Sequence, residues 1–182
     1  MEKAVRDGAD AIISLHNNGS GTIADYYNGC TVLVPRGVFR EDLSKTGQEL
    51  GCYILKELSE LGIENQGLMF RMTQDELYYD NGTLCDYYSI VRNATKAGIP
   101  GIIVEHAFLD DEEDYLLFLS DEEKLKALGK ADAAGIAGYY GLVKKDGGEA
   151  PEQLKNYREK ITLITTDFYE DNEYLEKTYF TE

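Results

Sequence analysis

Three short apolar runs predict buried strands of a central sheet. Residues 9–15 are mostly alanine, isoleucine and leucine, and the polar, glycine-rich segment 16–21 follows them. Residues 30–34 are rich in β-branched side chains, and residues 101–104 are Gly-Ile-Ile-Val, followed directly by Glu105. A continuous apolar run without alternation is typical of a strand that is covered on both faces. These runs therefore predict strands of a largely parallel sheet.

Two other segments have the spacing of amphipathic helices. Between residues 42 and 61, leucine and isoleucine recur along one helical stripe, and Gly62 is placed to end that helix. Ser120 and Glu123 have the spacing of a capping box, which predicts a second helix that ends near Gly141. The alanine and glycine residues of this second helix favour close packing on the sheet.

The remaining segments predict less. Residues 64–83 show no regular pattern, residues 87–91 have the composition of a further strand, and residues 161–166 are strand-like. We divide the chain into a domain over residues 1–143 and an acidic, tyrosine-rich appendage over residues 144–182. Strands that alternate with helices predict an α/β fold, a three-layer sandwich with a mostly parallel central sheet flanked by helices.

Composition excludes several classes of function. The chain has 182 residues, with 18 Lys and Arg against 34 Asp and Glu, for a net charge of −16. An acidic chain is a poor partner for nucleic acid, because phosphate binding needs clustered Lys and Arg. The sequence shows no apolar stretch long enough for a membrane span, and its charged first residues do not form a signal peptide. The three cysteines form no CxxC pair, so they predict no zinc ribbon.

The candidate chemistry lies directly after two of the predicted strands. His16 follows the first apolar run and Glu105 follows the run at 101–104. In a parallel sheet, both side chains would emerge at the carboxyl edge, where α/β folds build their sites. An imidazole and a carboxylate at that edge suit a divalent metal with a general base. The alternatives are a histidine satisfied by a loop carbonyl and a solvated surface carboxylate.

These residues stand in two ordered blocks that resemble the zinc-dependent N-acetylmuramoyl-L-alanine amidases, which are bacterial cell-wall lytic enzymes. Residues 9–18, Ala-Asp-Ala-Ile-Ile-Ser-Leu-His-Asn-Asn, resemble the family's segment around its last zinc-binding histidine. Residues 99–109 are similar to its later block, in which a proline and apolar residues precede a glutamate and Phe-Leu follows. The helix over 131–140 is similar to the family's closing helix, so the resemblance covers roughly residues 3–142.

The resemblance implies roles for two residues. His16 matches a zinc ligand, and Glu105 matches the catalytic glutamate that moves protons during hydrolysis of the amide between N-acetylmuramic acid and L-alanine. It implies Zn²⁺ as cofactor, a peptidoglycan muramoyl-peptide as substrate, and an extracellular or cell-wall location for the parent protein.

The departures from the family pattern are as informative as the matches. The family's other zinc-binding histidine and its ligating glutamate precede the segment that this sequence matches, and they have no counterpart here. We therefore expect an N-terminally incomplete domain with weak zinc affinity and low activity. An uncovered sheet edge would then favour self-association. His106 is a poor substitute ligand, because neighbouring side chains on a strand point to opposite faces.

Two other functions stay open at this point. One is a non-catalytic or degenerate module of the same fold that binds peptidoglycan or serves in assembly. The other is a zinc peptidase of related architecture, which rests on fold analogy alone. The acidic run at 110–114 is expected to be a solvated loop, because it lacks the spacing of a calcium site.

Overall fold

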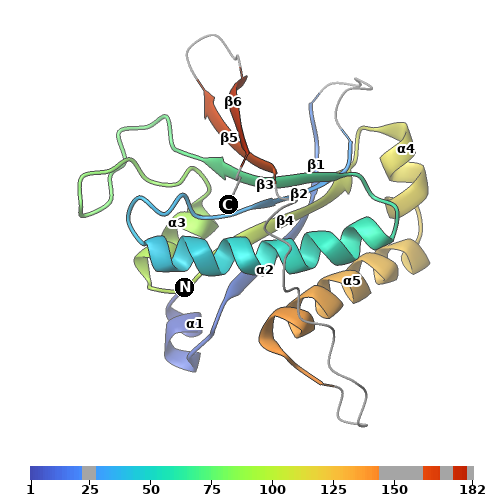
Figure 1. The fold of residues 1–182 in the computed structure, drawn as a ribbon, viewed down its shortest axis with the longest axis horizontal. Coiled ribbons are helices and arrows are strands. Elements are labelled where there is room, and N and C mark those ends of the chain that lie inside the picture. The colour runs from blue at the N-terminus through green and yellow to red at the C-terminus, as the bar shows by residue number, and fades with distance from the viewer. Residues whose placement is uncertain (22–27, 144–161, 169–173, 180–182) are drawn as a thin grey trace.

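The computed structural model describes residues 1–21 and 28–143, together with the backbone of 162–168 and 174–179. Its strands form one sheet in the order β1-β4-β2-β3-β5-β6 (Figure 1). The strands are β1 (Ile12–Asn18), β2 (Cys30–Leu33), β3 (Asn65–Arg71), β4 (Gly101–Phe108), β5 (Thr162–Phe168) and β6 (Tyr174–Tyr179). The helices are α1 (Glu2–Asp7), α2 (Glu41–Glu60), α3 (Ser89–Lys96), α4 (Glu112–Asp114) with the π-helical turn η1 (Tyr115–Leu119), and α5 (Glu122–Tyr140).

The sheet is mostly parallel, as the sequence predicts. Strand β1 pairs in parallel with β4, and β3 pairs in parallel with both β2 and β5. The two antiparallel pairs are β2 with β4 and β5 with β6. The predicted strand at 161–166 is confirmed as β5, which adds to the edge of β3. The boundary between residues 143 and 144 stays a prediction.

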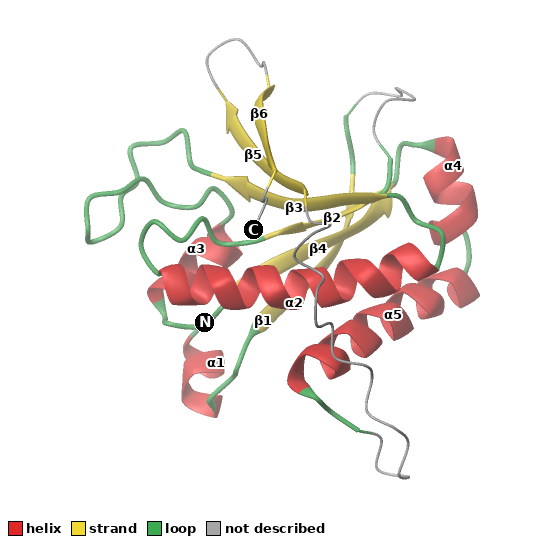
Figure 2. Cartoon of the chain, viewed as in Figure 1, coloured by secondary structure: helices red, strands yellow, loops and turns green. Residues whose placement is uncertain are grey.

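Helices cover the two faces of the sheet unequally. Helices α2 and α5 pack side by side on one face, and α3 lies on the other (Figure 2). The larger hydrophobic core lies under α2 and α5 and includes Leu50, Ile54 and Leu58 from the predicted helical stripe. The smaller cluster joins Leu33 and Ile103 of the sheet to Val91 of α3. The three-layer α/β fold is therefore confirmed, with most of its apolar burial on one side.

The contact between α2 and α5 depends on a glycine. A Cβ atom on Gly135 of α5 would lie 2.6 Å from the Cα of Ile54 in α2, closer than two carbon atoms can approach. The close packing predicted for this helix is thus found at Gly135, where the neighbour is α2, while Ala131 belongs to the core that includes strands of the sheet. The helix begins at Asp121, whose side chain accepts a hydrogen bond from the Lys124 amide, and ends at Gly141 in the left-handed conformation. The predicted cap at Ser120 is wrong by one residue.

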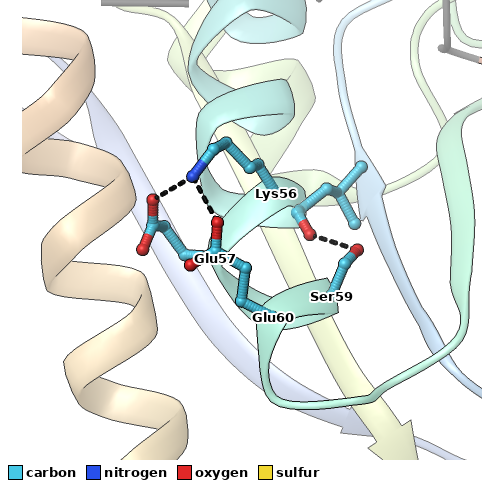
Figure 3. Close-up of polar contacts among 5 residues, drawn as sticks. Lys56, Glu57, Ser59 and Glu60 are labelled. Carbon is cyan, nitrogen blue, oxygen red and sulfur yellow. Dashed lines mark hydrogen bonds and ion pairs between the residues drawn. The ribbon is translucent and has the colours of Figure 1, made fainter. Parts of the chain in front are cut away.

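Helix α2 carries a small ion-pair group near its C-terminal end. Lys56 Nζ lies 2.6 Å from a Glu60 carboxylate oxygen and 3.0 Å from one of Glu57, and the Ser59 hydroxyl donates to the Leu55 carbonyl (Figure 3). The hydrogen bond to Glu60 is the main cause that raises the pKa of Lys56. The Lys56–Glu60 pair, at i,i+4 spacing, adds only about 0.3–0.5 kcal/mol to helix stability.

The strand predicted at residues 87–91 is wrong, and the segment at 64–83, which showed no pattern, contains a strand. Residues 87–91 do not form a strand, because Val91, Ala94 and Thr95 recur at helical spacing and are buried in α3. Strand β3 lies within the segment that showed no pattern, and Gly67 in its middle has a positive φ of 83° that breaks the regular alternation. No helix in the part of the chain that the structure describes is long and apolar enough to cross a membrane.

Candidate functional site

His16 and Glu105 are direct cross-strand neighbours. They are paired in the register of the parallel strands β1 and β4, near the carboxyl ends of both. Side chains of paired residues point to the same face of a sheet, so the imidazole and the carboxylate share one face. Thr31 of β2 pairs with Glu105 from the other side. The predicted meeting of His16 and Glu105 at one edge is confirmed, although 89 positions separate them in the sequence.

The Glu105 carboxyl group is poorly solvated. The side chain is half-buried, and its Oε2 atom is buried with no hydrogen-bond partner among the described residues. Desolvation raises the pKa of Glu105, and the nearby charges of His16 and His106 only partly oppose that rise. A carboxylate whose pKa is raised is a stronger base than an ordinary glutamate, which favours a role in proton transfer.

His16 is exposed and is held by its own strand. Its Nε2 atom lies 3.0 Å from the Ser14 hydroxyl, two residues earlier in β1 and therefore on the same face. Ser14 stands inside the segment that carries the family resemblance, but only its spacing of two residues from His16 could have indicated the contact. This contact orients an imidazole that is otherwise open to solvent and to a ligand.

His106 belongs to the opposite face. Its Nδ1 atom lies 2.7 Å from the backbone carbonyl oxygen of His16, and its Nε2 atom lies 2.9 Å from Oδ2 of Asp132 in α5. Burial lowers the pKa of His106, but Asp132, the His16 carbonyl and Glu105 together outweigh burial and raise it. Both ring nitrogens are thus engaged, and His106 cannot share a metal ion with His16.

The loops beside the site are joined by carboxylates. Asp110 accepts hydrogen bonds from the backbone amides of Ser20 and Gly21 and from the Ser20 hydroxyl, which ties the segment after β1 to the segment after β4. Asp114 is buried and accepts from the amides of Gly29 and Phe108. The expected solvated loop at 110–114 is therefore wrong for Asp114, because the amides of Gly29 and Phe108 replace solvent around its carboxylate. Asp110 stays accessible to solvent while it joins the two segments.

The described residues do not complete a metal site. Within residues 1–21 and 28–143, no group of three His, Cys, Asp or Glu side chains is arranged to hold a metal ion. His16 and Glu105 provide one imidazole and one carboxylate, whereas a catalytic zinc ion takes three protein ligands. This donor set alone does not fit a catalytic zinc.

The comparison with protein families decides what this arrangement belongs to. Residues 1–138 match the family described as N-acetylmuramoyl-L-alanine amidase. The chain belongs to this amidase family. The match covers both β1 and β4, so the paired His16 and Glu105 lie inside the family's domain. No curated protein matches the chain.

Solved structures agree with the amidase fold. Cwp6 from Clostridium difficile is similar with 27% identity and a TM-score of 0.57, over 74% of this chain and 18% of that one. The CwlD amidase from Clostridioides difficile, in complex with the GerS lipoprotein, is 20% identical with a TM-score of 0.51, over 78% and 60% of the two chains. Ami1 from Mycobacterium smegmatis is 19% identical with a TM-score of 0.51, over 77% and 59%. The chain therefore spans less than two thirds of each of these proteins.

Proposed function

We propose that this amidase-family domain serves in zinc-dependent hydrolysis of the amide between N-acetylmuramic acid and the L-alanine of peptidoglycan. Family membership supports the reaction class. The observation that carries the proposal within this chain is the pairing of His16 with Glu105, whose Oε2 atom is buried without a partner among the described residues. The parent protein would then act outside the cell, where peptidoglycan lies.

Glu105 is the group we assign to proton transfer. Its carboxylate would accept a proton from the water that attacks the amide carbonyl, and the carboxyl group would then give that proton to the leaving amine of L-alanine. The reaction consumes one water and yields a carboxylic acid and an amine, so the carboxylate is regenerated. The raised pKa of Glu105 suits both halves of this cycle.

His16 is the zinc ligand that we propose this chain contributes. It is exposed on the same face as Glu105 and is oriented by Ser14. The described residues offer no third donor of the kind that zinc requires, so we expect the isolated chain to bind zinc weakly and to hydrolyse slowly. We derive no step through the metal from this donor set.

One observation favours a second candidate, a non-catalytic module that binds muramoyl-peptides. The absence of a three-ligand group within residues 1–21 and 28–143 is what such a module would show. The two functions differ in the fate of the ligand, because a binding module retains an intact muramoyl-peptide and an amidase releases a peptide with a free amine.

The test uses muramoyl-L-alanyl-D-isoglutamine as substrate and measures the released amine at increasing zinc concentrations. The expected result is slow, zinc-dependent release that Glu105→Gln lowers by about 10²- to 10⁴-fold, the usual contribution of a general base. His16→Ala should abolish the zinc dependence. Tyr79→Phe, in a buried contact away from the site, is the matched control and should leave the rate unchanged. Saturable binding of substrate with no amine release at any zinc concentration would support the non-catalytic module instead.

The edge of the sheet supports a further part of the proposal, association with a second copy. Strand β1 is the last strand on its side of the sheet among the described residues. Its seven residues include no Lys, Arg, Asp, Glu or Pro, the residues that usually protect an edge from pairing. Leu15 on this strand is 53% exposed.

A further inference from the structure

A buried histidine and aspartate lie directly behind the proposed site. His106 is 5% exposed and Asp132 is 3% exposed. They connect β4 to α5 across 26 residues of sequence, with 2.9 Å between Nε2 and Oδ2. The proposed reaction uses neither side chain, yet His106 follows Glu105 in the chain and also contacts His16.

The contact with His16 has a defined direction. A carbonyl oxygen only accepts hydrogen bonds, so the Nδ1 atom of His106 must carry a proton and donate it to the His16 carbonyl over 2.7 Å. The Nε2 atom then faces the Asp132 carboxyl group, which fixes the ring plane. Because both nitrogens of the His106 ring are held, the His16 carbonyl that accepts its hydrogen bond has little freedom to move.

This hydrogen bond forms where the strand pairing becomes irregular. His16 pairs with Glu105, but the next pair along the strands is Asn18 with Phe108, so β4 advances by three residues while β1 advances by two. Such a bulge disrupts the regular ladder and re-aims nearby side chains. The His106 side chain thus donates a hydrogen bond to β1 at the point where the backbone hydrogen bonds between β1 and β4 are least regular.

We propose that His106 and Asp132 form a positioning pair that holds the end of β1 in register, so that His16 faces Glu105. The proposal rests on the proposed function of that site, and it adds two residues on the opposite face of the sheet. Neither touches substrate. They act through the backbone of His16, in the way that outer hydrogen bonds orient the groups that react.

The experiment is NMR on the full chain and on variants of the pair. Because the chain has only two histidines, the imidazole signals of His16 and His106 can be assigned without ambiguity. In Asp132→Asn, we expect a changed His16 imidazole signal, a weaker nuclear Overhauser effect between the His16 ring and the Glu105 side chain, and about tenfold faster amide exchange at the end of β1, since a bond to a charged group is weakened.

Two substitutions at position 106 separate positioning from simple packing. His106→Asn retains a side-chain N–H group near the position of Nδ1, whereas His106→Leu retains apolar bulk and no donor. We expect His106→Leu to loosen the His16–Glu105 contact and His106→Asn to restore much of it. Tyr79→Phe is the control, because it deletes a 2.6 Å hydrogen bond to the buried Asp86. Asp86 lies next to the residues that follow β2 and β3, at the end of those strands that is far from His16. Whatever this control does to amide hydrogen exchange in general, the His16 imidazole signal and the His16–Glu105 contact should match those of the wild type.

Two results would overturn the proposal. In the first, both Asp132→Asn and His106→Leu show the same His16 signal and the same His16–Glu105 contact as the wild type. The other is an equal change at His16 in Tyr79→Phe. If the NMR results are as expected but no amine is released from muramoyl-peptide at any zinc concentration, the proposed hydrolysis fails while the positioning contact stands.

Discussion

Two neighbouring residues of β4 face opposite sides of the sheet and have opposite surroundings. His106 lies on the side covered by α2 and α5, and both of its nitrogens have partners. Glu105 lies on the side that α3 covers only in part, and its Oε2 atom is buried without a partner among the described residues. Buried polar groups are normally satisfied. Asp132 Oδ1, beside His106, is also buried without a partner among the described residues. The contrast is therefore between the two side chains of β4: both nitrogens of His106 have partners, and one oxygen of Glu105 has none.

The largest expected effect is on the side of the sheet that α2 and α5 cover. Asp132→Ala removes the carboxylate and leaves the buried His106 without its partner, which should lower the free energy of unfolding by about 3–5 kcal/mol. Glu105→Gln replaces a carboxyl group whose Oε2 atom has no partner among the described residues, and it should change the free energy of unfolding by less than about 1 kcal/mol at pH 7. Urea denaturation measures both. Equal losses in the two variants would remove the contrast between the faces.

The apolar residues of the two faces should differ in the same direction. Ile54 is fully buried under α2 and α5, whereas Ile103 belongs to the small cluster with α3. The usual loss in free energy of unfolding for such a substitution is about 2–5 kcal/mol. Ile54→Ala should lie at the upper end of this range and Ile103→Ala at the lower end, because the larger core can close less around the cavity that is left. Thermal unfolding of the two variants gives the order. A larger loss at Ile103 would contradict it.

The pH dependence of stability isolates Glu105. Burial raises its pKa in the folded protein above the ordinary value of 4.5. Between the ordinary and the raised pKa, the folded state holds a proton that the unfolded chain has lost, so stability decreases as pH rises through this interval. Relative to Glu105→Gln, which does not titrate at this position, the wild type should therefore lose stability as the pH rises above the ordinary pKa of 4.5. If the free energy of unfolding of the wild type stays constant or increases relative to Glu105→Gln as the pH rises, the raised pKa of Glu105 is contradicted.

The smallest effect is expected at the edge of the sheet. Leu15→Lys places a charge on β1, and charged edge residues oppose pairing with another strand. Light scattering should show a mass that increases with concentration for the wild type and increases less for this variant. A wild type that remains a clean monomer across concentrations would contradict self-association through this edge.

The sequence predicted the parts of the fold that depend on local pattern. The strands that lead to His16 and Glu105 are continuous apolar runs, and the two long helices have clear stripes, so their positions are confirmed. The segment at 87–91 was assigned wrongly because tyrosine, isoleucine and valine favour strands, while the burial of one side at helical spacing appears only in the folded α3.

The site was predictable to a smaller extent. The position of His16 and Glu105 after apolar strands was enough to expect them at one edge, and the roles of both stay predictions. The Asp132 partner of His106 lies on a helix 26 residues away, and nothing local in the sequence marks it. The link from His106 to the His16 carbonyl depends on an irregular register between β1 and β4, which side-chain patterns do not encode.

The most direct test of the central claim is a zinc titration followed by NMR on the isolated chain. The account predicts that zinc shifts the imidazole signal of His16 and the carboxyl signal of Glu105 together, with weak affinity, and leaves His106 unchanged. Glu105→Gln should retain the shift at His16, and His16→Ala should remove the shift at Glu105. A zinc response at His106, or none at His16 and Glu105, would contradict the assignment of this pair as the reactive site.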